Sequence, residues 1–452
     1  MKFVAQDALL PEGWSRRVVI DVDDGGFIRS VVANSDAADA QALAGPVVPA
    51  MPNVHSHAFQ RAIAGRTGRS SPDRADSFWS WREAMYASLE RMDPDAFEAI
   101  AAQAYVEMLK SGYGSVAEFH YVHHDAAGTP YGDPAELAMR IAAAAGQTGI
   151  ALTLLPVFYA HAGFGGLPPM EGQRRFVHSV ASFAVLVDAL RERAEGRYVL
   201  GIAPHSLRAV TAPELEQISR LVPATAPIHI HAAEQTREVE ECYAATGMRP
   251  VEWLTSHAGV DKRWCIVHAT HMTEREIDAL AATGAVAGLA PTTEADLGDG
   301  TFPAPRYLAS KGRFAVGSDS NTVISPFEEI RMLEWSQRLH VRRRNVLGDD
   351  SGLAVGASLW ARAARGGAQA VAQPVGAIAA GCRADFLVLN EQDPALALQR
   401  ATDVLDAAIF GPSRNPVRDV VVAGRFVVRD GRHAREDAIR ERYRDTLARL
   451  SA

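Results

Sequence analysis

From residue 46 onward, short apolar runs alternate with longer stretches in which apolar residues recur every three or four positions. This alternation is typical of βα units that build a parallel sheet. Eight runs have the length of buried strands, and they lie near 47–57, 115–121, 151–159, 198–205, 226–231, 264–268, 284–290 and 313–319. Eight successive βα units predict a closed (β/α)8 barrel of the TIM type.

The helix expected after the first of these strands has clear ends. Asp93 is a suitable N-cap, and Pro94 suits the first helical position. Gly112 suits the position after the last turn. Between these ends, apolar side chains recur at helical spacing, at Phe97, Ile100, Ala101, Ala104, Tyr105 and Met108. The pattern therefore predicts a helix over 94–111, directly before a strand.

The two ends of the chain show a different pattern. Short runs at 17–22 and 27–32 are separated by an Asp-Gly turn signal, and similar runs return at 384–389 and 417–428. Such runs predict antiparallel strands. The two chain ends are therefore expected to build one small β domain together.

These patterns divide the 452-residue chain into a large and a small unit. Residues 48–372 are expected to form the barrel, within an α/β fold. Residues 1–47 and 373–452 are expected to form a small β-sandwich, the second segment ending in a helix. Because a single core stops growing at about 250–300 residues, two units fit this length.

Composition and charge exclude several kinds of partner. With 48% hydrophobic and 22% charged residues, the chain has an ordinary globular composition. A formal net charge of -8 lacks the basic excess that nucleic-acid binding needs, so an anionic substrate must be met by local arginines. No apolar run approaches the ~20 residues of a membrane span.

The cysteines and the N-terminal sequence favour the cytoplasm. Cys242, Cys265 and Cys382 are far apart and form no C-x-x-C motif, which predicts neither a disulfide framework nor a cysteine zinc site. The first residues reach Asp7 and the Pro11-Glu12 pair before an apolar segment can build, which argues against a secretory signal.

Histidines and one aspartate follow four of the predicted barrel strands. His55 and His57 share one face of the first strand, because residues two apart in a strand point the same way. His268 ends a later strand, and Asp319 ends the last, above Ala315 and Gly317, whose small size leaves room for a site. Since barrel sites are assembled from several strand ends, these residues together predict metal binding.

A fourth strand end adds a carboxylate. His231 lies nearer the active rim than His229, which we interpret as a hydrogen-bonded interior histidine. Glu234 follows three residues later, where a carboxylate can reach a metal-bound water without binding the metal, as a proton shuttle must.

The types of ligand favour a particular metal. Imidazoles with one carboxylate and no thiolate suit catalytic zinc with a position left open for water. The fourth-strand region offers only His205 and Arg208 and no lysine to bridge two metals, so one zinc per chain is expected.

This pattern resembles the amidohydrolase superfamily, in its mononuclear deaminase branch, over nearly the whole chain. The superfamily order is H-x-H, then H-x-x-E, then His, then Asp. The segments 51–61, MPNVHSHAFQR, and 78–86, FWSWREAMY, are similar to the formimidoylglutamate deiminase family. These two segments are more specific than the metal signature, because related guanine, cytosine and S-adenosylhomocysteine deaminases usually differ after H-x-H.

The resemblance assigns roles to individual residues. The implied zinc ligands are His55, His57, His231 and Asp319. The implied catalytic residues are Glu234, His268 and Asp319. The implied substrate contacts are Gln60, Arg82, Tyr121, His205 and Arg208.

The activity implied is hydrolysis of N-formimino-L-glutamate to N-formyl-L-glutamate and ammonia, a step of histidine degradation. The partner is then a small dicarboxylate. A homodimer is also expected, and the loop that carries Arg82 is long enough to reach a neighbouring subunit.

Other interpretations remain open at this stage. The protein could instead deaminate an aromatic base or nucleoside, or be a non-enzymatic scaffold, although the complete ligand and shuttle set argues against a scaffold. Arg208 could form only a surface salt bridge. Loop packing suits Trp79 and Trp81, helix core suits Met85 and Tyr86, and a solvated or helix-start position suits His123, His124 and His271.

Overall fold

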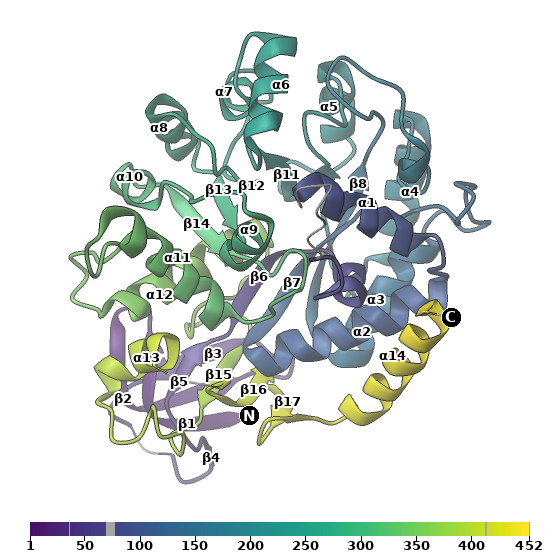
Figure 1. Cartoon of the computed structure of the whole chain (residues 1–452). Coiled ribbons are helices and arrows are strands. Elements are labelled where there is room, and N and C mark those ends of the chain that lie inside the picture. The colour runs from purple at the N-terminus through teal and green to yellow at the C-terminus, as the bar shows by residue number, and fades with distance from the viewer. Residues whose placement is uncertain (36, 69–76, 412–413, 452) are drawn as a thin grey trace.

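The computed structural model describes residues 1–35, 37–68, 77–411 and 414–451. Its centre holds parallel strands with helices around them (Figure 1). These strands are β6 (Met51–Ser56), β7 (Tyr113–His120), β8 (Ala151–Phe158), β9 (Val199–Leu200), β10 (Ala203–Pro204), β11 (Ile228–Ala232), β12 (Trp264–His268), β13 (Val286–Leu289) and β14 (Arg313–Val316). Every stretch that the sequence predicts as a buried strand contains strand residues, and the α/β class is confirmed.

The central strands pair as two parallel sheets. One has the order β10-β8-β7-β6, with β9 beside β8, and the other has the order β11-β12-β13-β14. Isolated backbone bridges join the sheets at both borders, Ser56 with Asp319 at one and Ser206 with His231 at the other. The pairing therefore continues from each sheet into the other, and the C-terminal strand ends meet on one side.

Helices cover the outside of these strands (Figure 1). The predicted helix over 94–111 is confirmed as α2 (Pro94–Ser111), in which the Asp93 side chain accepts a hydrogen bond from the Ala96 backbone N–H at 2.8 Å. The other α-helices are α1 (Phe78–Leu89), α3 (Glu136–Thr148), α4 (Val180–Arg193), α5 (Ala212–Ser219), α6 (Thr236–Thr246), α7 (Pro250–His257), α8 (Glu274–Thr283), α9 (Pro291–Leu297), α10 (Ala304–Ala309), α11 (Pro326–Val341), α12 (Val355–Ala370), α13 (Ala401–Phe410) and α14 (Glu436–Ser451). Two 3₁₀ helices are η1 (Ala58–Ile63) and η2 (Glu171–Gln173). Within the described ranges, no helix has both the length and the apolar character to cross a membrane.

Both chain ends contribute to one further sheet. Its strands are β1 (Lys2–Leu10), β2 (Gly13–Val22), β3 (Ile28–Val32), β4 (Gln41–Ala42), β5 (Val47–Pro49), β15 (Phe386–Leu389), β16 (Val417–Val422), β17 (Arg425–Arg429) and β18 (Arg432–His433). The order is β18-β17-β16-β15-β5-β1-β2-β3, with β4 beside β1.

This end sheet is strongly curved. Four strand spacings of ~4.8 Å would separate β1 from β17 by about 19 Å if the sheet were flat. The rings of Phe3 on β1 and Phe426 on β17 are nevertheless only 5.9 Å apart. The sheet therefore folds over its own apolar core. The expected β-sandwich would have two separate sheets. Here the two layers belong to one continuous sheet, because β5 pairs with both β1 and β15.

The C-terminal helix α14 leaves the end sheet and lies along α2 (Figure 1). Lys110 pairs with Glu436 at 2.6 Å, and Arg442 pairs with Glu98 at 2.7 Å. The segment after residue 372 is thus shared between the end sheet and the outer helices of the central strands.

The border between β6 and β14 is tight at Gly317. The backbone N–H of Asp319 donates to the His55 carbonyl at 2.9 Å, and that of His57 donates to the Asp319 carbonyl at 3.0 Å. A Cβ atom on Gly317 would lie 2.7 Å from both the backbone N and O of His55. The glycine therefore allows the strand that carries Asp319 to approach the strand that carries His55.

Replacing Gly317 with alanine should separate these two strands. We expect a loss of roughly 1–3 kcal/mol of stability, as for other overpacked sites, measured as a lower midpoint of thermal unfolding. Gly146→Ala is the matched control, because an added Cβ at this position on α3 meets nothing within 4 Å. Equal unfolding midpoints for Gly317→Ala and the unsubstituted protein would contradict this account of the border.

Candidate active site

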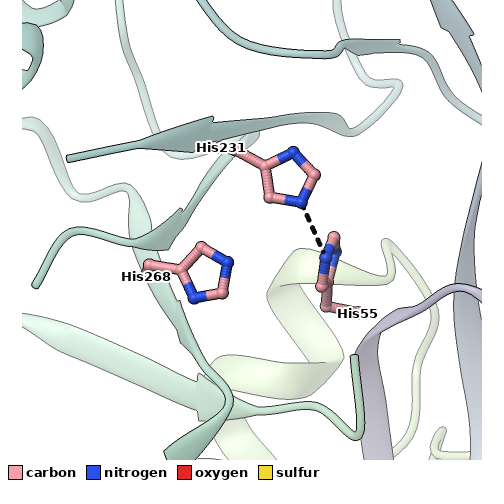
Figure 2. A group of neighbouring side chains, drawn as sticks. All are labelled: His55, His231 and His268. Atoms are coloured by element: carbon pink, nitrogen blue, oxygen red, sulfur yellow. Dashed lines mark hydrogen bonds between the residues drawn. The ribbon is translucent and has the colours of Figure 1, made fainter. Parts of the chain in front are cut away.

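Three imidazoles from three strands converge at the C-terminal strand ends. His55 is the second-last residue of β6 on one sheet, while on the other sheet His231 is the second-last residue of β11 and His268 ends β12 (Figure 2). The Nε2 atoms of His55 and His231 are 3.0 Å apart, and one ligand atom from each of the three rings lies within 4.8 Å of the others. Two nitrogens bound tetrahedrally to one zinc, each at ~2.0–2.1 Å, would be about 3.3 Å apart. The spacing of His55 and His231 is thus close to that of a shared ion.

A second group shares His55 and adds His57 and Asp319. The Oδ1 atom of Asp319 lies 3.3 Å from Nε2 of His55 and 3.4 Å from Nε2 of His57. In His57 and His231, the backbone fixes the second ring nitrogen. Nδ1 of His57 donates to the Phe119 carbonyl at 2.9 Å. Nδ1 of His231 donates to the His205 carbonyl at 3.0 Å. Such bonds leave Nε2 of each ring available to a metal.

Electrostatics give this group the protonation that metal binding needs. Burial, reinforced by repulsion from His55, lowers the pKa of His57 to about 3. Burial acts to raise the pKa of Asp319, but attraction to His55 and His57 outweighs it and holds that pKa below its usual value. Neutral imidazoles and an ionised carboxylate are the forms that bind a divalent ion.

The chain bends sharply at the strand ends that carry this chemistry. His268 has a φ of 67°, Asp319 has a φ of 43°, and Ala233, between His231 and Glu234, has a φ of 52°. For a residue other than glycine, a left-handed backbone conformation costs of order 1–3 kcal/mol. It persists only where the surrounding structure enforces it. The hydrogen bond from the Ala269 N–H to the Ala232 carbonyl, 3.0 Å, is one such restraint.

Glu234 lies just beyond β11, facing His268. Its Oε1 atom is 3.5 Å from Nε2 of His268. Burial raises the pKa of Glu234 to about 7, against the attraction of His268. A carboxyl group that titrates near neutral pH can both donate and accept a proton under physiological conditions.

One cavity brings the remaining predicted site residues together. It is lined by His57, Gln60, Phe78, Trp81, Arg82, Met85, Tyr86, Tyr121, Tyr159, Phe176, His205, Arg208, His231, Glu234, Thr293, Leu297, Asp319 and Ser320. All five residues expected to contact substrate are in this set, beside three of the expected ligands. Arg82 lines the cavity of its own chain, together with other side chains of α1.

Three arginines lie near the Trp79 indole ring, and two of them, Arg82 and Arg208, line this cavity. The guanidinium carbon of Arg82 lies 4.5 Å from the Trp79 ring centre, that of Arg208 lies 5.9 Å away, and that of Arg237 on α6 lies 4.4 Å away. Arg208 is only 7% exposed, and within the described chain its Nε atom is buried without a hydrogen-bond partner. Three gathered cations and an unpaired buried N–H favour an anionic ligand.

Comparison with known proteins identifies the family. The sequence model of the Amidohydrolase family matches residues 47–427. The chain belongs to the amidohydrolase family. A curated relative from Pseudomonas aeruginosa, named Formimidoylglutamate deiminase, is 49% identical over 99% of this chain and 98% of its own length. A 5-methylthioadenosine/S-adenosylhomocysteine deaminase from Shouchella clausii is 26% identical over 90% of this chain and 88% of its own length.

Solved structures agree with this family. An amidohydrolase from Brucella melitensis superposes with a TM-score of 0.94 at 47% identity, and the match covers 100% of both chains. An atrazine chlorohydrolase from Arthrobacter aurescens, complexed with zinc, superposes with a TM-score of 0.81 at 18% identity, covering 99% of this chain and 100% of its own, which shows a shared fold alone.

Two acidic residues of this amidohydrolase escaped the sequence analysis. Glu294, on α9 after β13, has its Oε1 atom 3.3 Å from Nδ1 of His268 and 3.0 Å from the Ala290 N–H. Asp299, just after that helix, lies with Glu234 and His268 in a third close group. Their position just after a predicted barrel strand could have indicated that they belong to the site. However, β13 does not end in a histidine, so this strand end was not predicted to contribute.

Several structural expectations can now be decided. His229 is an interior histidine, because it donates to the Ala370 carbonyl at 2.8 Å. The solvated interpretation of His123 and His124 was wrong, since both are buried and donate to backbone carbonyls of Val157 and Val177. The loop prediction for Trp79 and Trp81 was wrong, because both lie in helix α1. Met85 belongs to the core, as expected, and it also lines the cavity with Trp81 and Tyr86.

Proposed function

We propose that this amidohydrolase hydrolyses N-formimino-L-glutamate to N-formyl-L-glutamate and ammonia, in histidine degradation. The observation that carries this proposal is a single cavity lined both by buried Arg208 and by three of the expected metal ligands, His57, His231 and Asp319. The first suits a substrate carboxylate and the second suits metal-assisted hydrolysis. The relative with 49% identity over nearly the whole chain supports the same substrate.

The metal in this proposal is zinc, about one ion per chain. Its ligands are His55, His57, His231 and Asp319, all buried. His55 links them, because it belongs to one close group with His57 and Asp319 and to another with His231. Imidazoles with one carboxylate suit zinc better than the all-oxygen sites of magnesium or calcium. When bound, zinc supplies a nucleophile at neutral pH by lowering the pKa of water to ~7.

The protein's own groups then move the protons. Asp319 lies beside two ligand histidines and accepts the proton of the attacking water. Glu234 gives a proton to the departing nitrogen, so that the C–N bond breaks and ammonia leaves as the carbonyl forms. His268, held by Glu294, hydrogen-bonds to the tetrahedral centre.

Substrate recognition uses five other residues of the cavity. Arg208 offers a planar fork for one carboxylate of the dicarboxylate substrate, and Arg82 offers a second. The other three contacts come from Gln60, Tyr121 and His205. Gln60 and Tyr121 are already aligned, because the Gln60 amide donates to the tyrosine hydroxyl at 2.8 Å.

The wider organisation is part of the same proposal. The bridged central strands favour a closed (β/α)8 barrel spanning residues 48–372, with residues 1–47 and 373–452 as the small β domain. We also propose a homodimer, which light scattering would test. A cytoplasmic location suits the three free cysteines.

An ammonia-release assay tests the substrate. The protein should release ammonia from N-formimino-L-glutamate, and much more slowly from N-formimino-L-aspartate, whose carboxylates are one methylene closer together. Guanine, cytosine and adenosine are the controls, since they carry no carboxylate for Arg208. Efficient turnover of one of these bases, with none of the formimino acid, would favour an aromatic-base deaminase.

Glu234→Gln tests proton transfer. The amide keeps the size of the side chain but cannot cycle a proton, so the turnover number should fall by at least ~10² while zinc content stays near normal. Elemental analysis and steady-state kinetics measure the two quantities. A variant that loses its zinc, and regains full rate when zinc is restored, would show that Glu234 is not the shuttle.

Arg208→Met and Arg208→Lys test the carboxylate contact. Methionine keeps much of the bulk but removes the fork, so kcat/KM for N-formimino-L-glutamate should fall by roughly 10²–10³. Lysine should rescue only part, because a point charge cannot form two parallel hydrogen bonds. An unchanged kcat/KM in the methionine variant would remove Arg208 from substrate binding.

A further inference from the structure

A third group of potential metal ligands adjoins the proposed zinc site. Glu234, His268 and Asp299 each offer one atom within 4.8 Å of the others, and all three residues are buried. They come from three separate segments, which follow β11, end β12 and follow α9. None of them belongs to the proposed zinc ligand set.

The geometry is near that of an occupied site. Ligand atoms bound tetrahedrally to one zinc ion at ~2.0–2.2 Å lie about 3.3–3.6 Å apart, so shifts of up to about 1 Å would complete the group. The Nε2 atom of His268 and Glu234 Oε1 are already 3.5 Å apart. Two carboxylates and one imidazole are a common donor set for zinc.

Two atoms of the group have no hydrogen-bond partner among the described residues. Within the described part of the chain, Nε2 of His268 and Oδ2 of Asp299 are buried and accept or donate no hydrogen bond. The other Asp299 oxygen is held by the Gln235 amide, which fixes the orientation of this carboxyl group. Buried polar atoms without partners are unusual and call for a ligand.

The surrounding charge also favours a cation. Glu238 and Glu294 border the group, and the Glu238 carboxylate accepts from the Glu234 backbone N–H at 3.0 Å. Four carboxyl groups thus lie in or beside the group, and a bound divalent cation would offset the repulsion among those that are ionised.

We infer that Glu234, His268 and Asp299 form a second divalent-cation site, which zinc fills after the first site and which inhibits the enzyme. Occupancy would hold Glu234 and His268 as ligands, so neither could transfer or share a proton with substrate. Binding here should be weaker than at the first site, because another cation is nearby. The inhibition rests on the proposed function, whereas the binding does not.

Zinc stoichiometry tests the binding directly. Protein carrying its first zinc is equilibrated by dialysis at increasing free zinc, and bound metal is measured by elemental analysis. The unsubstituted protein should take up a second equivalent, and Asp299→Asn should require at least ~10-fold more free zinc, because one anionic ligand is lost. Asp393→Asn is the matched control, a buried aspartate outside the group, and should still bind the second equivalent.

Retention of the first zinc shows that each variant is folded, and Asp299→Ser replaces the asparagine variant if that one fails. A single equivalent bound by the unsubstituted protein, or an unchanged second equivalent in both Asp299 variants, would overturn the site.

Ammonia release over the same zinc series tests the inhibition. The rate should fall as the second equivalent binds, and each Asp299 variant should resist this fall relative to its own rate at low zinc. Inhibition that is equal with and without Asp299 would overturn the regulatory role. If no ammonia is released at any zinc concentration, the proposed function fails, and the stoichiometry still decides the site.

Discussion

The active site depends on the close backbone contact between β6 and the end of β14. This contact bridges Ser56 with Asp319 and brings the only carboxylate among the proposed zinc ligands to the two histidines of β6. Gly317 makes the approach possible, since any side chain there would meet the backbone of His55. The same border joins one parallel sheet to the other, so the fold and the metal cluster share one structural requirement.

Burial then divides the cavity into regions of opposite character. Desolvation lowers the pKa of His55, His57 and His231 and keeps these imidazoles neutral and available as ligands. Around His268, by contrast, carboxyl groups cluster. Arg208 and Arg82, which also line the cavity, lie near the Trp79 ring and favour an anion. A substrate with a basic formimino group and two carboxylates matches this polarity, because amidines are protonated at neutral pH.

Much of this arrangement could be predicted from local sequence. Strand alternation placed His55 and His57 on one face, and the Asp93 cap and Gly112 gave the ends of α2, all as the structure has them. Residues recruited through tertiary contacts could not be found in this way. Glu294 and Asp299 follow a strand without a histidine, and only folding brings them to His268. His123 and His124 are buried because backbone carbonyls far away in the sequence accept their hydrogen bonds. Their polarity alone therefore suggested, wrongly, that they are exposed to solvent.

The central claim is that hydrolysis requires one metal ion held by His55, His57, His231 and Asp319. Elemental analysis of protein dialysed against metal-free buffer, paired with its rate of ammonia release from N-formimino-L-glutamate, tests this most directly. About one zinc ion per chain should remain, strong chelation should abolish the activity, and added zinc should restore it. Full activity in protein shown to contain no metal would contradict the account.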